Sequence, residues 1–422
     1  MLYEIMIPIV LVATFVQVFI RYGFGTRIPI GDEIEYLRRV SSNDPFGPSP
    51  FLRVPVMVML TWLVSRTTSH TEARMRDVLG FIAVLTACCL GMAGYLAWGG
   101  VGALVVTLLF IFLPDRMVLS QHLWPDALLA LWQAGVLVCL MWSIEVAPLS
   151  PWIFGFFVAA SAMTRIDGLA MAPALTLVAV LRQQDLASVL PGIWVPTAIA
   201  LALLTLIHAV RYRIAWPDTT LLFNLSLMAE EHAQQNSESA AVQGLTRTIW
   251  QKWEKRTHGD RVACTSQSVV VLIRQPGRVI RGIADRIWQM LGPDTFGMNR
   301  LLDPVTGAYP EITPRTRALL VRALQISFPL LAALGLAGAI FDEHARICLV
   351  PGVVAFVVAC LFHARTRFRY AVLPGLALAA VAGLRAVFDA STREWALGIF
   401  FVALLLLLMA PERKENEAPS PA

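Results

Sequence analysis

The segment VLGFIAVLTACCLGMAGYLAW, at residues 78–98, contains no charged side chain and has the length of a membrane-spanning helix. Such a helix needs about 20 consecutive, mostly apolar residues, because the hydrocarbon core of a bilayer is about 30 Å thick. Similar runs occur at 5–20 (IMIPIVLVATFVQVFI) and at 395–410 (WALGIFFVALLLLLMA). These segments predict a protein that crosses a membrane repeatedly.

The composition supports this prediction. Of the 422 residues, 57% are hydrophobic and only 15% are charged, whereas soluble proteins carry about 45–50% apolar and 25% charged residues. The surplus of apolar residues is expected to face lipid. The net charge of +5 comes from 31 Arg and only 3 Lys. These are scattered through connecting segments, which is typical of membrane topology signals rather than of a nucleic-acid-binding surface.

The apolar segments predict an all-α, polytopic membrane protein with about 10–12 transmembrane helices, several of the segments being short for a full crossing. The segments lie at 5–20, 51–65, 78–96, 101–113, 124–143, 151–163, 168–181, 189–209, 317–340, 346–362, 370–388 and 394–410.

Polar sequence divides the chain into four parts. An N-terminal membrane module covers 1–210 and contains a first polar loop at 21–50, and an extracytoplasmic, helical loop region is predicted at 211–316. C-terminal membrane helices follow at 317–410. The last part, 411–422, has the composition of a disordered cytoplasmic tail.

Within the large loop region, RQPGRVIRGIADRIWQML (274–291) predicts a helix that lies at the lipid surface. Helical spacing places its apolar side chains on one face: Val279, Ile280, Ile283, Ile287 and Met290. Its basic side chains are expected largely off that face: Arg274, Arg278, Arg281 and Arg286.

Two adjacent acids, Asp32 and Glu33, follow the first apolar segment closely. Carboxylates held at a membrane boundary are uncommon unless they are used, although charges at the ends of spans cost far less than charges at the bilayer centre. The pair alone is therefore compatible with a catalytic site and with an ordinary solvated loop.

Five short motifs accompany this acidic pair in a fixed order along the chain. They are DEIEY (32–36), LRVP (52–55), LPDRMVLSQHLWPDALL (113–129), MTRIDGL (163–169) and HARTRFRYAVLPGLALAAVAGL (363–384). In this order the set resembles the GT-C superfamily of membrane glycosyltransferases, in particular the protein O-mannosyltransferase and aminoarabinose transferase branch. The resemblance covers roughly 1–181 and 317–388.

The resemblance implies roles for several residues. In that superfamily the acidic residue of the first extracytoplasmic loop is catalytic; Asp32 matches it, with Glu33 beside it, and Tyr36 of the same motif is expected to contact substrate. Asp126 matches a second acidic position, which in some branches helps to bind a metal and in others holds the first loop. Asp126 also fits an ordinary helix start after Pro125.

The chemistry of such a transfer needs one base and one or more cations. Displacing a polyprenyl phosphate from a sugar requires a base for the acceptor proton but no strong acid, because the phosphate diester leaves as a stable anion. An Arg–phosphate pair at about 4 Å contributes on the order of 4 kcal/mol before desolvation is subtracted, at an effective dielectric near 20. The candidate cations are Arg165, His363, Arg365, Arg367 and Arg369.

The basic run at 363–369 and the separate Arg165 each have an alternative explanation. The run 363–369 also fits a positive-inside loop, and Arg165 also fits a structural pair with Asp167.

The three apolar segments between the loops of Asp32 and Asp126 raise a question of topology. An odd number of crossings would place the two acids on opposite faces, so one of these segments must be incomplete if the acids share a site. The segments 51–65 and 101–113 are the shortest, and a helix of about 13 residues reaches only about 20 Å.

The sequence therefore predicts a glycosyltransferase of the bacterial inner membrane that moves a sugar from a polyprenyl-phosphate donor, with inversion, to an extracytoplasmic glycan, lipid or protein acceptor. Asp32 is the predicted general base, on the extracytoplasmic side. No cofactor is assigned, and no nucleic-acid partner is expected. No H-x-x-x-H or D-x-D spacing supports a divalent metal, and whether the site binds one stays open.

Two alternatives remain. A polymerase or ligase of lipid-linked glycans would depend on 211–316 rather than on Asp32. A transporter or scaffold of envelope assembly is the non-enzymatic alternative, but a transporter should place ionisable groups at mid-membrane depth, and here nearly all lie at segment ends.

Overall fold

A computed structural model gives the fold of the chain. The structure describes residues 2–23, 27–29, 32–41, 55–212, 266, 269–270, 273–274, 276–291, 302–303, 307–362, 369 and 372–409. The predicted tail at 411–422 and most of the loop region 211–316 lie outside these ranges.

The described residues form helices and connecting turns, with no strand among them. Each of the twelve predicted apolar segments coincides with helix: α1 (Leu2–Gly23), α3 (Pro55–Thr67), α4 (Thr71–Ile111), α6 (Asp126–Glu145), α7 (Pro151–Thr164), η1 (Ile166–Ala170) with α8 (Met171–Leu181), α9 (Leu186–Tyr212), α15 (Pro314–Phe341), α16 (Glu343–Phe362), α17 (Leu373–Phe388) and α18 (Arg393–Leu408). Of these, α1, α4, α6, α9 and α15 are long and apolar enough to cross a membrane. The all-α prediction is confirmed.

Helix α4 consists of two antiparallel arms. Its backbone leaves helical geometry at Trp98 and at Gly99, whose φ of 72° favours glycine. A Cβ atom on Gly91 would lie 2.8 Å from Oγ1 of Thr107, although these residues would be about 24 Å apart in a straight helix. The predicted segments 78–96 and 101–113 are therefore two helices joined by a sharp reversal.

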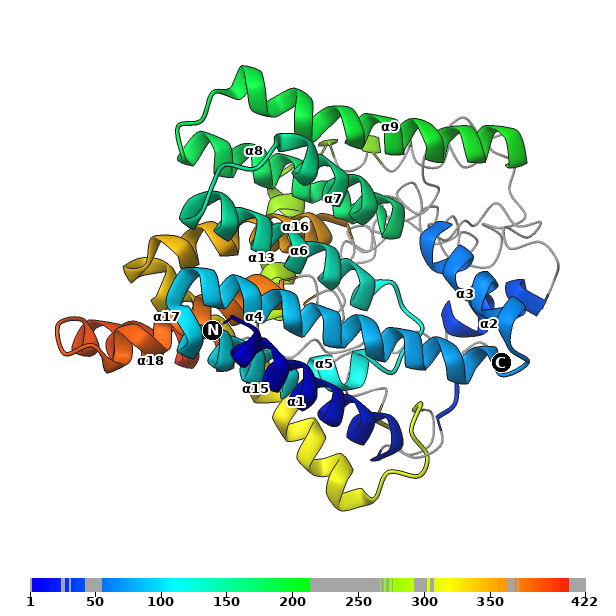
Figure 1. The fold of residues 1–422 in the computed structure, drawn as a ribbon, viewed down its shortest axis with the longest axis horizontal. Helices are drawn as coiled ribbons and strands as arrows, with labels where there is room; N and C mark the ends of the chain where they lie inside the picture. Colours follow the sequence, from blue (N-terminus) through cyan, green and yellow to red (C-terminus); the bar gives the residue numbers. More distant parts are fainter. Residues whose placement is uncertain are drawn as a thin grey trace.

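Helix α3 bears on the odd number of segments between the two acidic loops. It has 13 residues, lies at the same end of the long helices as α2 (Asp32–Ser41), and packs on α2, α4 and α7 (Figure 1). The two arms of α4 then lie between the loop of Asp32 and the loop of Asp126, so the chain returns to the end of the bundle at which α2 lies. That 51–65 is the incomplete segment stays a prediction.

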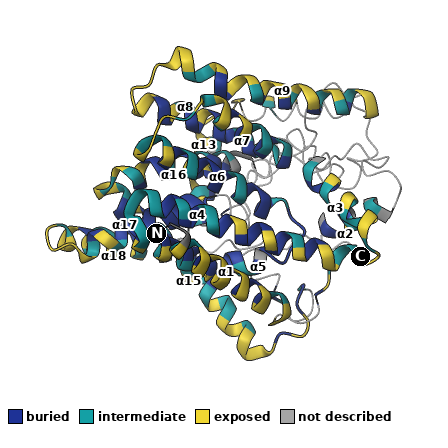
Figure 2. Cartoon of the chain, viewed as in Figure 1, coloured by how far each residue is buried: buried dark blue, intermediate teal, exposed yellow. Residues whose placement is uncertain are grey.

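Close helix packing depends on small residues. A Cβ atom on Gly338 of α15 would overlap the carbonyl oxygen of Ala379 in α17, so the two backbones approach as small residues allow in membrane bundles. Large apolar side chains face outward instead, among them Phe15, Val210 and Trp395. Figure 2 shows exposed residues along much of α9 and α18. Such an exposed apolar surface suits a lipid environment.

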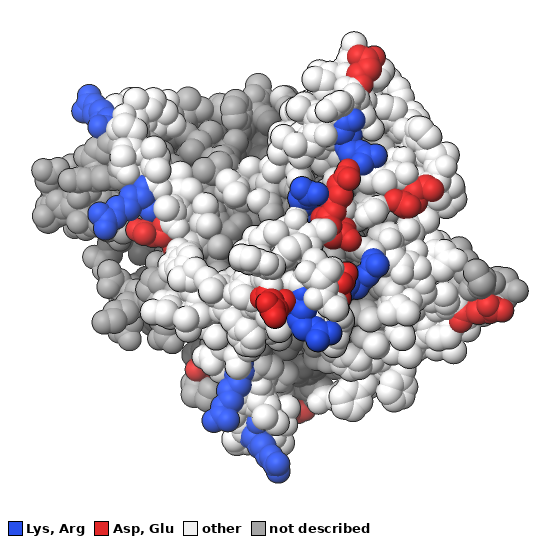
Figure 3. All heavy atoms as spheres, turned by 90° about the vertical axis from the view of Figure 1, so that its left-hand side faces the viewer, with Lys and Arg blue, Asp and Glu red and all other residues white. Residues whose placement is uncertain are grey.

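The end of the bundle opposite α2 is polar. Figure 3 views this end and shows charged side chains of both signs close together. Arg182 pairs with Glu343 at 2.6 Å, and Nε2 of His344 lies 2.6 Å from Oε1 of Glu145. These pairs join the ends of helices that are distant in sequence.

Helix α13 (Pro276–Leu291) forms within the predicted segment 274–291 and packs on α15 and α16. Met290 is buried as its place on the apolar face requires, but Arg286 is buried too. The expectation that Arg286 lies off the packed face is therefore wrong, because the bundle covers Arg286 and leaves Ile280, on the apolar face, 67% exposed. Its position at the lipid surface stays a prediction.

Replacing Gly338 by Ala should destabilise the protein by about 1–3 kcal/mol, because the added methyl group forces α15 and α17 apart. Gly398→Ala in α18 is the matched control, since no heavy atom lies within 4 Å of the added Cβ. Thermal unfolding in detergent measures both. Equal melting temperatures for Gly338→Ala and wild type would refute the close α15–α17 packing.

Candidate active site

The buried carboxylate of Glu33 joins the first loop to the segment ahead of α6. Its Oε1 accepts a hydrogen bond of 2.5 Å from the backbone N–H of Leu123, and its Oε2 lies 3.3 Å from Nδ1 of His122. Glu33 is 0% exposed. The loop of Asp32 and the loop of Asp126 therefore meet at one end of the bundle, as a shared site requires.

Arg27 completes this contact. Its guanidinium group forms an ion pair with Glu33, donates to the carbonyl oxygen of Gln121 and lies 2.6 Å from Nδ1 of His122. Because a guanidinium group can only donate, Nδ1 accepts and the imidazole proton resides on Nε2. Nε2 lies 3.1 Å from the hydroxyl oxygen of Tyr309, to which it donates. We call Arg27, Glu33, His122 and Tyr309 the Glu33 network.

The electrostatics of the Glu33 network agree with a neutral imidazole. Burial, with a further contribution from Arg27, lowers the pKa of His122 to about 4. Burial also raises the pKa of the Tyr309 hydroxyl above its ordinary value. At neutral pH the network therefore contains one ion pair and two neutral rings.

Asp32 is the first residue of α2, and its side chain lies outside the described atoms. One turn further along α2, Tyr36 is buried and interacts electrostatically with Arg165. The predicted residues Asp32, Glu33 and Tyr36 therefore belong to one short helix that connects the Glu33 network with the surroundings of Arg165.

Arg165 lies between two carboxylates. Its Nη1 donates to Oδ1 of Asp126 at 2.5 Å, and its Nε and Nη2 donate to the two oxygens of Asp167 at 2.9 and 2.6 Å. Burial lowers the pKa of Arg165, but Asp167 and Asp126 outweigh burial and raise it overall. The Arg165–Asp167 pair, which the sequence offered as an alternative to phosphate binding, is therefore present. We call Asp126, Arg165 and Asp167 the Asp126 cluster; two carboxylates and one guanidinium group give it one net negative charge.

The Asp126 cluster contains one carboxylate oxygen without a hydrogen-bond partner. Oδ2 of Asp126 is buried and has no hydrogen-bond partner. A cation or a donor hydroxyl would satisfy it. However, the described part of the chain contains no group of three His, Cys, Asp or Glu side chains that could hold a metal ion.

A third cluster surrounds Arg369, the residue of the predicted basic run that the structure describes. Its guanidinium group lies 4.7 Å from the ring centre of Phe328 and interacts with Asp115, whose Oδ2 accepts a hydrogen bond of 3.0 Å from Ser327. Burial raises the pKa of Asp115, and Arg369 opposes this. Arg286 and Arg369 both interact electrostatically with Cys360. We call Arg286, Arg369 and Asp115 the Arg369 cluster.

The remaining predicted cations, His363, Arg365 and Arg367, lie outside the described residues. Sequence reasoning did not assign roles to Arg27, His122, Tyr309 or Asp115. His122 and Asp115 stand in the quoted motif at 113–129, and Arg27 precedes Asp32 by five residues, which were usable signals. Tyr309 carried no local signal.

Comparison with known proteins supports the fold. No family model matches the chain, and no curated protein matches it either. The oligosaccharyltransferase of Archaeoglobus fulgidus in its apo form is a similar solved structure, with a TM-score of 0.50, 14% sequence identity, and coverage of 95% of this chain and 56% of that one. The archaeal oligosaccharyltransferase AglB from Archaeoglobus fulgidus, in complex with an inhibitory peptide and a dolichol-phosphate, gives a TM-score of 0.49 and 15% identity, covering 96% of this chain and 55% of that one.

The chain thus spans little more than half the length of these structures. Together with the apolar helices, the likeness at a TM-score of 0.50 defines a polytopic membrane protein with an all-helical fold like that of this oligosaccharyltransferase. This confirms the predicted fold class.

The protein should lose stability as the pH falls from about 6.5 toward 4, because the unfolded chain protonates His122 while the folded chain excludes that proton. Near pH 5 the loss from this group is about 2 kcal/mol. Melting temperatures of wild type and His122→Gln at neutral pH and near pH 5 provide the measurement. The wild type should lose more than the variant; an equal loss would rule out a neutral, buried His122.

Proposed function

We propose that this protein is a membrane glycosyltransferase that moves a sugar from a polyprenyl-phosphate donor to an acceptor hydroxyl, with Asp32 as the general base. The observation that carries the proposal is the burial of Glu33 against the backbone of Leu123. This contact supports the proposal because it joins α2, which begins at Asp32, to the segment that leads into α6, which begins at Asp126.

The reaction is a single displacement. The acceptor oxygen forms a bond to the anomeric carbon while its proton passes to the Asp32 carboxylate. The bond from that carbon to the phosphate oxygen breaks, and polyprenyl phosphate leaves with the electron pair, which inverts the configuration. The net negative charge of the Asp126 cluster would stabilise the positive charge that develops on the sugar ring in such transfers.

Glu33 has a different role in this proposal from the catalytic one that the sequence suggested. Its carboxylate is held by Arg27 and by the Leu123 N–H, so it positions the helix rather than exchanging protons with substrate. Tyr36 and Asp126 are proposed to border the sugar, as predicted.

The Arg369 cluster is the proposed site of the donor phosphate. Among the described residues, two buried guanidinium groups accompany one carboxylate here. The predicted cations His363, Arg365 and Arg367 belong to the same connection between α16 and α17, and we propose that they share this role. Arg165 is less suited to it, because its guanidinium group already binds two carboxylates.

The fold likeness to an oligosaccharyltransferase supports the class of reaction. The proposed donor, acceptor and mechanism are argued from the Glu33 network, the Asp126 cluster and the Arg369 cluster.

The proposed location is a bacterial inner membrane, with the α2 end of the bundle on the extracytoplasmic side. Several arginines lie at this end, and the positive-inside tendency alone would favour the cytoplasm for it. Arg27 and Arg165, however, are buried in pairs with carboxylates, so the site itself accounts for them.

A polymerase or ligase of lipid-linked glycans is the second candidate. It is favoured by the contribution of 211–316 to the buried clusters, through Tyr309 and Arg286. Such an enzyme would not depend on Asp32.

Asp32→Asn should lower the rate of sugar transfer by about 10²–10⁴-fold, because the variant lacks the base for the acceptor proton. Transfer of radiolabelled sugar from polyprenyl-phosphate donors in membranes, at equal protein level, measures this. Glu394→Gln, which changes an exposed acid in the first turn of α18, is the control and should keep its rate. Full activity of Asp32→Asn would remove the assigned base, and a wild type that transfers sugar from no such donor would exclude the donor class.

A further inference from the structure

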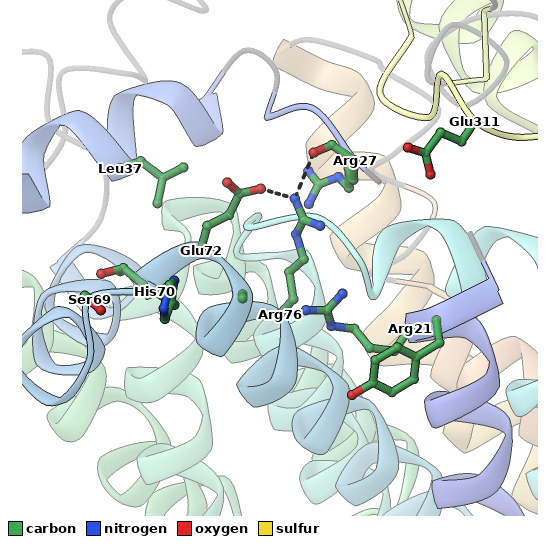
Figure 4. A pocket seen from close by; sticks show the side chains of 11 residues that line it. Arg21, Arg27, Leu37, Ser69, His70, Glu72, Arg76 and Glu311 are labelled. Carbon is green, nitrogen blue, oxygen red and sulfur yellow. Dashed lines mark hydrogen bonds and ion pairs between the residues drawn. The ribbon is translucent and has the colours of Figure 1, made fainter. Parts of the chain in front are cut away.

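A pocket of about 770 Å³ lies beside the Glu33 network and shares no residue with the Asp126 cluster or the Arg369 cluster. Its walls come from the end of α1, the first loop, α2, the turn at 69–70 and the start of α4 (Figure 4). The charged and imidazole side chains that line it are Arg21, Arg27, Arg76, Glu72, Glu311 and His70. The proposed sugar transfer uses none of these except Arg27, so the pocket is a candidate site for a second ligand.

The pocket lies where the lipid-facing surface of α1 ends. This helix exposes Phe15 and Phe19, and Tyr22, which is 76% exposed, lines the pocket one turn later. An aromatic side chain directly after an apolar span is typical of the boundary between membrane and water. A ligand can therefore reach the pocket from the headgroup layer of the membrane as well as from water.

Three guanidinium groups meet at this pocket. Figure 4 shows the side chains of Arg21, Arg27 and Arg76 extending toward one another. The charges of Arg27 and Arg21 both act against that of Arg76, and a bound anion would relieve this repulsion. Arg27 is buried in its ion pair with Glu33. Arg21 and Arg76 are therefore the guanidinium groups available to a ligand.

Arg21 and Arg76 have N–H donors beyond those in their ion pairs. Arg21 uses Nε, which lies 3.2 Å from Oδ1 of Asp77, and its two Nη atoms make no hydrogen bond to any described residue. Arg76 uses Nη2 for Glu72. Its Nε is buried without a hydrogen-bond partner, and the residue is only 7% exposed. Because a buried donor without an acceptor is costly, this side of the pocket lacks an acceptor.

The first turn of α4 adds backbone donors to the same pocket. Thr71, Glu72 and Ala73 begin this helix and line the pocket, and the first N–H groups of a helix have no partner inside it. The N-cap residue, His70, forms no side-chain cap hydrogen bond. Aligned peptide dipoles place partial positive charge at this end of a helix, so such N–H groups suit an anion.

We propose that this pocket binds a phosphate group, with Arg21, Arg76 and the first N–H groups of α4 as donors. Phosphate oxygens only accept hydrogen bonds, and they form strong, charge-assisted ones with guanidinium groups. The phosphate can belong to a lipid headgroup or be free in solution, and the position beside α1 favours the lipid. This site is additional to the one proposed for the donor phosphate at the Arg369 cluster, and its existence does not depend on the proposed reaction.

The test is direct binding to the purified full-length protein in detergent, measured by native mass spectrometry. The probes are dioleoyl phosphatidylglycerol, farnesyl phosphate and inorganic phosphate, and dioleoylglycerol, which has no phosphate, is the ligand control. Arg21→Gln removes one donor group, and Ala73→Glu adds a carboxylate at an exposed lining position. Arg74→Gln is the matched control, because Arg74 is exposed, neighbours Ala73 and lies outside the lining.

At least one phosphate compound should bind wild type and Arg74→Gln equally, and bind Arg21→Gln and Ala73→Glu about ten-fold more weakly or worse, a difference of about 1.4 kcal/mol. If only the two lipids show this pattern, the ligand is a lipid headgroup; if inorganic phosphate shows it as strongly, the ligand is free phosphate. The proposal is overturned if no phosphate compound binds wild type, if neither pocket variant weakens binding, or if dioleoylglycerol binds as tightly as phosphatidylglycerol. Because no sugar is transferred in this experiment, its outcome is separate from that of the Asp32→Asn assay.

Discussion

The rest of the site depends on one buried carboxylate, that of Glu33. It is held by an ion pair with Arg27 and by the backbone N–H of Leu123, which is 90 positions away in the sequence. A buried ion pair contributes little net stability, but removal of one partner leaves an uncompensated buried charge that costs about 3–5 kcal/mol. The pair therefore specifies which loops meet. It brings the start of α2 to the segment ahead of α6.

Three groups of side chains gather around this junction, and their charges suit different tasks. The Glu33 network is neutral overall and rigid, since every one of its members is buried. The Asp126 cluster carries a net negative charge and one open carboxylate oxygen. The Arg369 cluster brings two guanidinium groups together with one carboxylate. In the proposed reaction these groups position the base, face the sugar and receive the departing phosphate.

The sequence predicted the fold well because each apolar run specifies a helix on its own. It predicted the shared face of Asp32 and Asp126 only conditionally, since this depends on whether 51–65 crosses the membrane. The Glu33 network was out of reach, because Tyr309 meets His122 across 187 positions and no local pattern encodes that contact. Arg286 was misplaced for a related reason: helical periodicity gives an angle around an axis but not the neighbour that covers it.

The most direct measurement of the central claim is a double-mutant cycle between Arg27 and Glu33. Arg27→Met, Glu33→Gln and the double variant are compared with wild type by reversible unfolding in mixed micelles. A coupling free energy of at least about 1.5 kcal/mol is expected, as close charge pairs show. Additive effects, within about 0.5 kcal/mol, would contradict it, because the first loop would then be held in place by other contacts.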